Sequence, residues 1–316
     1  MRQVEIPPSW SEALERIRSQ GGFYLVLGAT DTGKTTFCRL AVDSLREAGK
    51  IPSLVDGDIG QSQYGLPGTI FGLRWDAPPK RERRTLTAFF VGATSPRGAS
   101  LQCLAGICRV TAAARVGHTD AVLVDTTGYI RGPAAVALKQ AKIAALQPDA
   151  LLLLQRGEEA EPIVSAGHVP QVIRLECPRA VSVRTREQRR ERRRARFAAY
   201  FANAASHFFL WGEKQIWTGG LPHFEWCLQA ETQDPQGTVR VRLLEQVLVR
   251  YPGLLVGLRA EGGELRGLGL LTIAEPGAPV EVFSPVAPGD YSAVQLGLIT
   301  LDRSGEERGR VDDTYE

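Results

Sequence analysis

Short apolar runs alternate with stretches of helical periodicity from the start of the chain to about residue 175. Each apolar run has the length of one strand, and a polar residue or a glycine follows it. The runs cover residues 23–27, 51–55, 86–91, 121–124, 150–154 and 172–175. Helical patterns cover residues 10–19, 36–45, 100–114 and 133–145. Buried strands that alternate with helices predict the α/β class, with a mostly parallel sheet flanked by helices on both faces.

The pattern changes after about residue 235. Repeated short apolar runs separated by glycine turns cover residues 253–258, 267–273, 280–283 and 293–299. Such spacing is typical of a small all-β domain. We therefore expect a short N-terminal helix in residues 1–20, a larger α/β domain in 21–234, and a small β domain with a tail in 235–316.

Composition adds little to this picture, but it excludes some classes of protein. The chain of 316 residues is 43% hydrophobic and 23% charged, which is ordinary for a globular protein. No apolar run approaches the roughly 20 residues that span a bilayer. The N-terminus lacks the apolar core of a signal peptide. We expect a cytoplasmic protein without a membrane partner.

The segment from Gly28 to Thr35 has the glycine, lysine and threonine spacing of a phosphate-binding P-loop. It follows a predicted strand and precedes a predicted helix, which is the context that this motif requires. The glycines let backbone N–H groups turn toward phosphate oxygens, and the helix adds its positive end. We expect Lys34 to reach the β- and γ-phosphates and the Thr35 hydroxyl to bind Mg²⁺. The residues predicted to bind the nucleotide here are Gly28, Thr30, Asp31, Thr32, Gly33, Lys34, Thr35 and Thr36.

Carboxylates follow two of the predicted strands. Asp56 and Asp58 follow the run 51–55, and Asp125 follows the run 121–124. Beside a phosphate-bound Mg²⁺, one carboxylate can hold the metal and another can accept a proton from an attacking hydroxyl. We predict Thr35, Asp58 and Asp56 as the metal-side residues. The sequence does not rank these acids against Asp125, and an Asp-Gly turn with solvated acids is the structural alternative.

Arginines are concentrated in residues 184–196. A solvated basic helix is the usual form of such a run. The sharper interpretation is a lid, at about residues 184–201, whose arginines stabilise charge on a transferring phosphoryl group.

Together these segments resemble the 5′-hydroxyl polynucleotide kinase family, which includes the kinase subunit of the eukaryotic pre-mRNA cleavage factor and the nucleolar kinases of pre-rRNA processing. The resemblance extends from about residue 20 to 303, and we expect the long N-terminal domain of the cleavage-factor subunit to be missing. It rests on the P-loop, on residues 56–61, 92–97, 125–129 and 155–158, and on the arginine cluster.

The resemblance implies a role for individual residues. Asp58 matches the acid that activates the 5′-hydroxyl, and Gln61 belongs to the same motif. Thr126 matches the first threonine of a clasp that holds the P-loop lysine, Lys34. Arg184 and Arg189 match lid arginines that contact the triphosphate, with Arg190 as a substitute for Arg189. The catalytic residues are then Lys34, Asp58, Arg184 and Arg189, and Gln61 and Thr126 join those that bind the nucleotide.

We therefore predict an ATP-dependent kinase, with GTP as a possible donor, that phosphorylates the free 5′-OH end of RNA or DNA in the presence of Mg²⁺. The alternative is a regulatory or scaffolding P-loop protein of RNA processing with little or no kinase activity.

Overall fold

The computed structural model describes residues 6–76, 82–165, 171–178, 181, 183–218 and 244–311. The chain forms two compact units: the first contains Met1–Val91 and Ser95–Gln188, and the second contains Gly92–Thr94 and Arg189–Glu316. The predicted boundary at residue 234 lies outside the described residues. The two units meet in sequence inside helix α6 (Arg186–Phe201), at a point that composition does not mark.

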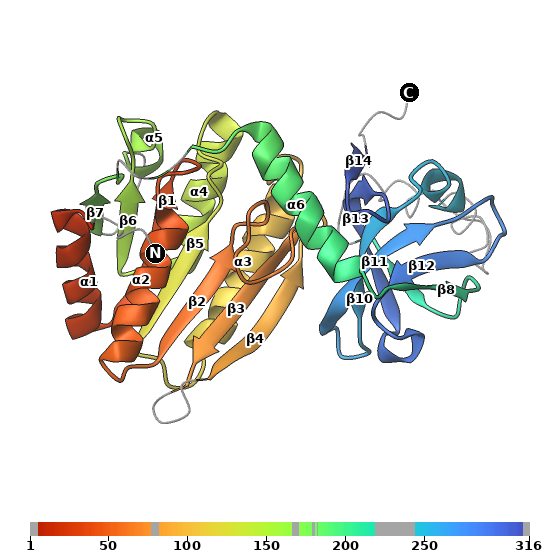
Figure 1. The fold of residues 1–316 in the computed structure, drawn as a ribbon, viewed down its shortest axis with the longest axis horizontal. Coiled ribbons are helices and arrows are strands. Elements are labelled where there is room, and N and C mark those ends of the chain that lie inside the picture. The colour runs from red at the N-terminus through yellow and green to blue at the C-terminus, as the bar shows by residue number, and fades with distance from the viewer. Residues whose placement is uncertain are drawn as a thin grey trace. The chain divides into compact units, whose positions relative to one another are not determined.

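The first unit is built on a seven-stranded sheet in the order β4-β3-β2-β5-β1-β6-β7 (Figure 1). The strands are β1 (Gly22–Gly28), β2 (Pro52–Gly57), β3 (Thr69–Trp75), β4 (Arg83–Phe90), β5 (Ala121–Thr126), β6 (Ala150–Leu154) and β7 (Gln171–Leu175). The helices are α1 (Pro8–Gln20), α2 (Lys34–Glu47), α3 (Ser100–Arg115), α4 (Pro133–Leu146) and α5 (Glu161–Val164). The predicted α/β class is confirmed.

Five of these strands are parallel, and the two at one edge are not. β3 pairs antiparallel with β2, and β4 pairs antiparallel with β3. The predicted run 86–91 corresponds to β4, whereas β3 is not among the predicted strands. On the other side of β2 the pairing is parallel, and its register places Asp56 opposite Asp125. Asp125 is in turn opposite Val26 of β1, so the ends of three neighbouring strands lie together.

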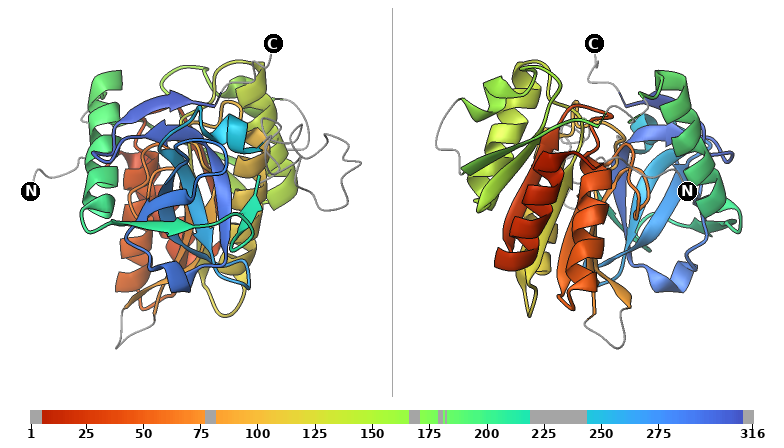
Figure 2. Two further views of the ribbon diagram at one scale, coloured as in Figure 1. Left: turned by 90° about the vertical axis from the view of Figure 1, so that its right-hand side faces the viewer. Right: turned by 60° about the vertical axis from the view of Figure 1, so that its left-hand side comes forward.

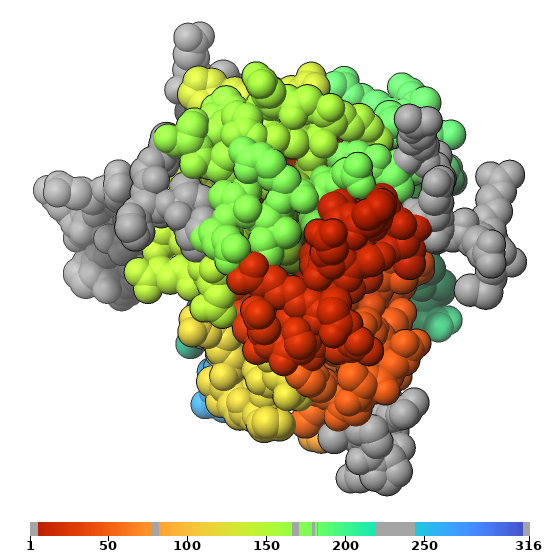
Figure 3. Space-filling view, turned by 90° about the vertical axis from the view of Figure 1, so that its left-hand side faces the viewer, coloured from red at the N-terminus to blue at the C-terminus, as the bar shows by residue number. Residues whose placement is uncertain are grey.

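Helices cover both faces of this sheet. Figure 1 shows α1 and α2 in front of it and α3 and α4 behind it, and the turned view on the right of Figure 2 agrees. The front layer packs through a cluster in which Trp10 of α1 meets Phe37 of α2 edge to face, with ring centroids 5.2 Å apart. Trp10 Nε1 also donates to Glu176 O, 2.8 Å away, just after β7. Figure 3, viewed from the left-hand side of Figure 1, shows the red N-terminal segment beside a green segment of the first unit.

The second unit contains most of α6 and a second seven-stranded sheet, in the order β14-β13-β10-β11-β12-β8, with β9 paired to β13. Its elements are β8 (Ala205–Phe209), β9 (Gln215–Trp217), β10 (Leu254–Arg259), β11 (Leu265–Thr272), β12 (Val280–Ser284), the 3₁₀ turn η1 (Pro288–Asp290), β13 (Ala293–Leu301) and β14 (Glu307–Arg310). The pairings are antiparallel except that of β9 with β13. The predicted C-terminal β domain is therefore present, and it begins as early as β8. No helix among the described residues of either unit is long and apolar enough to cross a membrane.

Candidate active site

The P-loop connects β1 to α2, as the sequence predicts. Gly28 has a φ of 154°, and a Cβ at this position would lie 2.2 Å from the carbonyl oxygen of Leu154, so the loop leaves β1 where only glycine fits. Gly33 has a φ of 103° and directly precedes Lys34, the first residue of α2. Thr35 and Thr36 follow in the first turn of α2. The N–H groups of such a first turn lack partners within the helix, which makes the loop suited to phosphate.

Lys34 is buried at the base of this loop, with 5% of its surface exposed. Its Nζ donates a hydrogen bond to the carbonyl oxygen of Ala29, 2.6 Å away. The Thr32 hydroxyl donates to the same oxygen at 3.0 Å. An ammonium group carries three hydrogens, so Lys34 can donate to a phosphate as well as to the loop.

Asp125, at the end of β5, is the carboxylate that contacts the P-loop threonine. Its Oδ2 accepts a hydrogen bond of 2.6 Å from the Thr35 hydroxyl. Its Oδ1 is buried and has no hydrogen-bond partner among the described residues. Burial is the largest cause that raises the pKa of Asp125 to about 7; Lys34 opposes the rise, and Asp56 adds to it. A buried carboxylate beside a threonine hydroxyl, with one oxygen that has no hydrogen-bond partner, is the donor set that P-loop proteins use for Mg²⁺.

Asp56 and Asp58 have different surroundings, although they are two residues apart. Asp56 Oδ2 accepts hydrogen bonds from the Ser62 hydroxyl at 2.8 Å and from the backbone N–H groups of Gln63 and Tyr64 at 2.9 and 3.0 Å. Its carboxylate therefore organises the loop after β2, whereas the contact with Thr35 is made by Asp125.

Asp58 keeps one carboxylate oxygen open. Its Oδ1 accepts from the backbone N–H groups of Gly60 and Gln61, both at 3.1 Å, whereas its Oδ2 accepts no hydrogen bond from the described residues. Gln61 turns its side-chain amide back to Gly60 O at 2.8 Å. Half-buried, rigidly held and open at one oxygen, Asp58 has the properties of a proton acceptor.

Thr126 has a different lysine partner from the one expected. The resemblance implies that it holds Lys34, but its hydroxyl accepts a hydrogen bond of 2.8 Å from Nζ of Lys139, in α4. The same hydroxyl donates to Val26 O at 2.8 Å, and Lys139 also donates to Thr127 O at 2.7 Å.

Comparison with known proteins identifies the group to which this site belongs. Residues 28–203 match the family described as mRNA cleavage and polyadenylation factor CLP1 P-loop. The chain belongs to this family. The resemblance drawn from the sequence is therefore confirmed.

Several named relatives match over almost their whole length. A polyribonucleotide 5′-hydroxyl-kinase of Pyrococcus horikoshii is 29% identical, covering 98% of this chain and 94% of that protein. Another from Methanocaldococcus jannaschii is 28% identical, covering 98% and 96%. A solved structure of a Clp1p–Pcf11p complex superposes with a TM-score of 0.63 at 15% identity, covering 90% of this chain and 76% of that one, and supports the fold.

Two arginines hold Asp31, in the middle of the CLP1-type P-loop. Asp31 has a φ of 57°, unusual for a residue other than glycine. Arg156, just after β6, donates to its carbonyl oxygen at 2.9 Å. The backbone N–H of Arg184 donates to the Asp31 carboxylate at 2.9 Å, and the Arg184 guanidinium lies 3.8 Å from it. Arg184 is therefore at the P-loop, as the lid interpretation requires.

Arg189 and Arg190, the other arginines that the resemblance assigns to the lid, belong to the second unit. Arg189 is its first residue after the break within α6. Arg190 forms an ion pair of 2.9 Å with Glu306, in the segment before β14.

From the sequence, Asp125 stays unranked, Arg156 is placed at a strand end without a role, and Lys139 is missed. The sequence contained a signal for Lys139, because Lys139 and Lys142 fall on the same face of α4 as the buried Leu138 and Ile143, where lysine is unusual.

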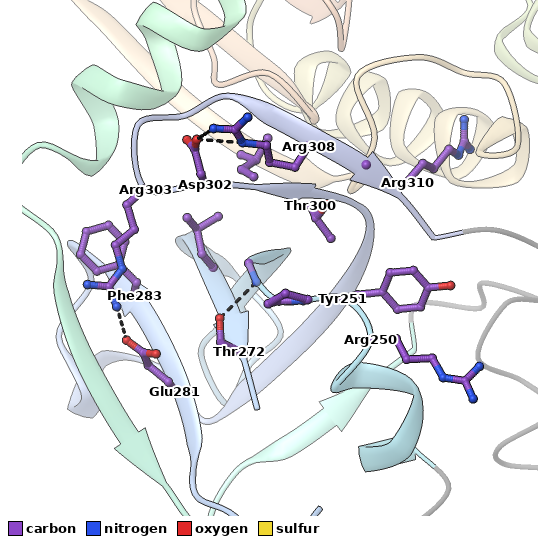
Figure 4. Close-up of a pocket in the computed structure, with 15 residues that line it drawn as sticks. Arg250, Tyr251, Thr272, Glu281, Phe283, Thr300, Asp302, Arg303, Arg308 and Arg310 are labelled. Carbon is purple, nitrogen blue, oxygen red and sulfur yellow. Dashed lines mark hydrogen bonds and ion pairs between the residues drawn. The ribbon is translucent and has the colours of Figure 1, made fainter. Parts of the chain in front are cut away.

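A separate cavity of about 530 Å³ lies in the second unit, lined partly by arginines (Figure 4). Two of these arginines already have acidic partners. Arg303 pairs with Glu281 at 2.5 Å, and Arg308 pairs with Asp302 at 2.6 Å. Local acids therefore compensate the charges of these two arginines.

Proposed function

We propose that this chain is an ATP-dependent kinase that phosphorylates the 5′-hydroxyl end of RNA. The observation that carries the proposal is the division of labour between two carboxylates at adjacent strand ends. Asp125 contacts the P-loop threonine, and Asp58 keeps Oδ2 open to accept a proton. A nucleotide-binding site alone needs only the first of these; a phosphotransferase needs both. The relatives named as polyribonucleotide 5′-hydroxyl-kinases support RNA as the acceptor.

In the reaction, the 5′ oxygen of the acceptor forms a bond to the γ-phosphorus, and the bond from that phosphorus to the β,γ-bridging oxygen breaks. The proton of the attacking hydroxyl moves to Asp58 Oδ2. Lys34 and the P-loop N–H groups stabilise the charge on the phosphate oxygens, and Arg184 lies where it can add a further positive charge. The products are ADP and a 5′-phosphorylated end.

Mg²⁺ fits the donor set of Thr35 and Asp125, because Asp125 Oδ1 is buried without a protein partner. When bound, the ion would neutralise part of the charge on the phosphates. Asp125 and Thr35 would hold it. Asp58 remains available for the proton, because its oxygens make no contact with Thr35 among the described residues.

The test is transfer of the labelled γ-phosphate of ATP to 5′-OH oligonucleotides, with RNA and DNA tested in parallel and GTP as a second donor. We expect Asp58→Asn to lower the rate of transfer by about 10²–10⁴-fold, the range for loss of a general base. Asparagine keeps an oxygen that can accept from Gly60 and Gln61, so the loop and nucleotide binding should survive. Lys34→Ala should weaken nucleotide binding itself.

Asp43→Asn is the matched control, because Asp43 is on the same unit and its side chain is 48% exposed. It should leave the rate unchanged. If ATP binds but neither oligonucleotide gains label, the kinase proposal fails and the chain is a nucleotide-binding regulatory protein. An equal loss of rate in Asp43→Asn and Asp58→Asn would remove Asp58 from its assigned role.

A further inference from the structure

Two lysines of α4 are buried in the first unit. Lys139 is 0% exposed and Lys142 is 1% exposed. Burial disfavours an ammonium ion, and it is the largest cause that lowers the pKa of both side chains; for Lys139 the pKa lies well below its usual value. A buried lysine therefore lowers the stability of the fold unless hydrogen bonds to its ammonium group compensate the cost of burial.

The two lysines differ in their contacts. Lys139 Nζ donates to the Thr126 hydroxyl and to Thr127 O, at 2.8 and 2.7 Å. Lys142 Nζ has no hydrogen-bond partner among the described residues. Lys139 therefore binds two groups at the end of β5, whereas Lys142, about one helical turn further along α4, binds none among the described residues.

The segment that Lys139 holds, Asp125 to Gly128, touches the P-loop at both of its ends. At one end, Asp125 Oδ2 accepts a hydrogen bond of 2.6 Å from the Thr35 hydroxyl. At the other end, Gly128 lies against Thr30 so closely that a Cβ would be 2.4 Å from the Thr30 backbone nitrogen. Lys139 binds the middle of this segment, and through the Thr126 hydroxyl the contact continues to Val26 O on β1, the strand that leads into the P-loop.

We propose that Lys139 is a positioning residue: it fixes the Asp125–Gly128 segment against the P-loop and so sets the affinity of the site for the metal–nucleotide complex. Asp125 has no hydrogen bond on Oδ1 to orient it, so its direction depends on the Thr35 contact and on the backbone that Lys139 anchors. The inference rests on the proposed function only in taking ATP and Mg²⁺ as the ligands. It does not depend on which group accepts the phosphate.

The experiment compares Lys139→Met with Lys142→Met in the full chain. Methionine is close to lysine in length and volume, so each variant removes an ammonium group and little else. Binding of a fluorescent ATP analogue is measured over a range of Mg²⁺ concentrations, and kinase activity is measured separately. We expect Lys139→Met to weaken Mg²⁺-dependent binding by about 10–100-fold, the range for residues that orient metal ligands. Binding without Mg²⁺ should change much less, and Lys142→Met should match the wild type in both.

Thr126→Val provides a second route, because it removes the hydroxyl that Lys139 binds and keeps the shape of the side chain. It should shift the Mg²⁺ dependence in the same direction, and its effect should not add fully to that of Lys139→Met in the double variant. If Lys139→Met fails to fold, Thr126→Val alone decides. Wild-type Mg²⁺ dependence in Thr126→Val, or equal losses in the two lysine variants, would overturn the proposal. Absence of RNA phosphorylation by a wild type that binds Mg²⁺ and nucleotide would instead count against the kinase function.

Discussion

The buried charged residues of the first unit differ from the buried Arg259 of the second unit in their hydrogen bonds. In the first unit Lys34, Asp56, Asp125, Lys139 and Lys142 are each at most 5% exposed. Two of them keep an atom without a hydrogen-bond partner among the described residues, Asp125 Oδ1 and Lys142 Nζ. In the second unit the buried Arg259 donates from Nε to Gln295 at 2.6 Å and from Nη1 to Gly263 O at 2.7 Å. Its charge is engaged by groups of the protein itself.

Arg259 forms hydrogen bonds within the protein and so has a structural role, whereas an unpartnered atom such as Asp125 Oδ1 can bind a ligand. A buried ion whose donors are engaged stabilises its surroundings, whereas one with an open atom costs free energy until something binds it. Under the proposed function, Mg²⁺ would offset this cost at Asp125, since Mg²⁺ binds carboxylate oxygens. Lys142 has no such ligand that the described residues reveal. The comparison therefore predicts that changes near the P-loop have large effects and that similar changes in the second unit have small ones.

The same substitution made in both units tests this most strongly. In Gly128→Ala the new methyl group would lie 2.3 Å from Thr30 Oγ1 and 2.6 Å from Thr30 Cα, so the P-loop must move. We expect a loss of stability of about 1–3 kcal/mol, typical of overpacking, together with weaker nucleotide binding. In Gly289→Ala, in the second unit, the methyl group meets no atom within 4 Å, and neither property should change. Urea unfolding and ATP titration measure the two variants, and equal effects would show that the two units tolerate an added methyl group equally.

Removal of the unpaired buried charge should have the next largest effect, and in the opposite direction. Lys142→Met should stabilise the protein at pH 7 by about 1–3 kcal/mol, because a buried ion without a hydrogen-bond partner is replaced by an apolar side chain of similar volume. Chemical denaturation of wild type and variant gives the difference directly. A destabilised variant would show that the Lys142 ammonium group makes a stabilising interaction in the folded chain.

The advantage of Lys142→Met should depend on pH. Burial lowers the pKa of Lys142 in the folded chain, while the charges of Cys103, Asp58 and Cys108 oppose that shift. Between the folded pKa and the ordinary lysine value of 10.5 the unfolded chain binds more protons, so the wild type gains stability as pH rises through this window. The difference in unfolding free energy between the wild type and Lys142→Met should therefore become smaller from pH 7 to pH 9.5. A difference in unfolding free energy that does not change with pH would mean that the pKa of Lys142 is not shifted in the folded chain.

The P-loop and the sheet were predictable because local rules determine them. Gly28 and Gly33 occupy backbone positions that other residues rarely adopt, and the P-loop motif records that requirement directly. The strands of the parallel core are buried on both faces, so each appears as a continuous apolar run. β3 was missed because it is interrupted by Gly72 and Arg74 and pairs antiparallel at the edge of that core.

The partners of the site residues were not predictable because they depend on packing between elements distant in the chain. Lys139 reaches Thr126 only because α4 lies across the end of β5. That Asp125 contacts Thr35, whereas Asp56 binds the loop 62–64, is a matter of packing that no pattern in the sequence states. The division inside α6 is likewise set by contacts of the second unit, where Phe201 stacks on Phe283 with centroids 5.9 Å apart.

An exposed ion pair of the second unit should contribute the least to the free energy of unfolding. Arg303 pairs with Glu281 at 2.5 Å and lies 4.7 Å from the centre of the Phe283 ring, but its side chain is 62% exposed. Water and salt screen such a pair, so Arg303→Gln should cost less than about 1 kcal/mol of unfolding free energy. Glutamine keeps much of the contact with Phe283, and the remaining difference should shrink as salt is raised from 0.05 to about 0.5 M. Urea unfolding at the two salt concentrations measures this. A loss as large as that of Gly128→Ala would mean that charge at the surface of the second unit matters as much as packing against the P-loop.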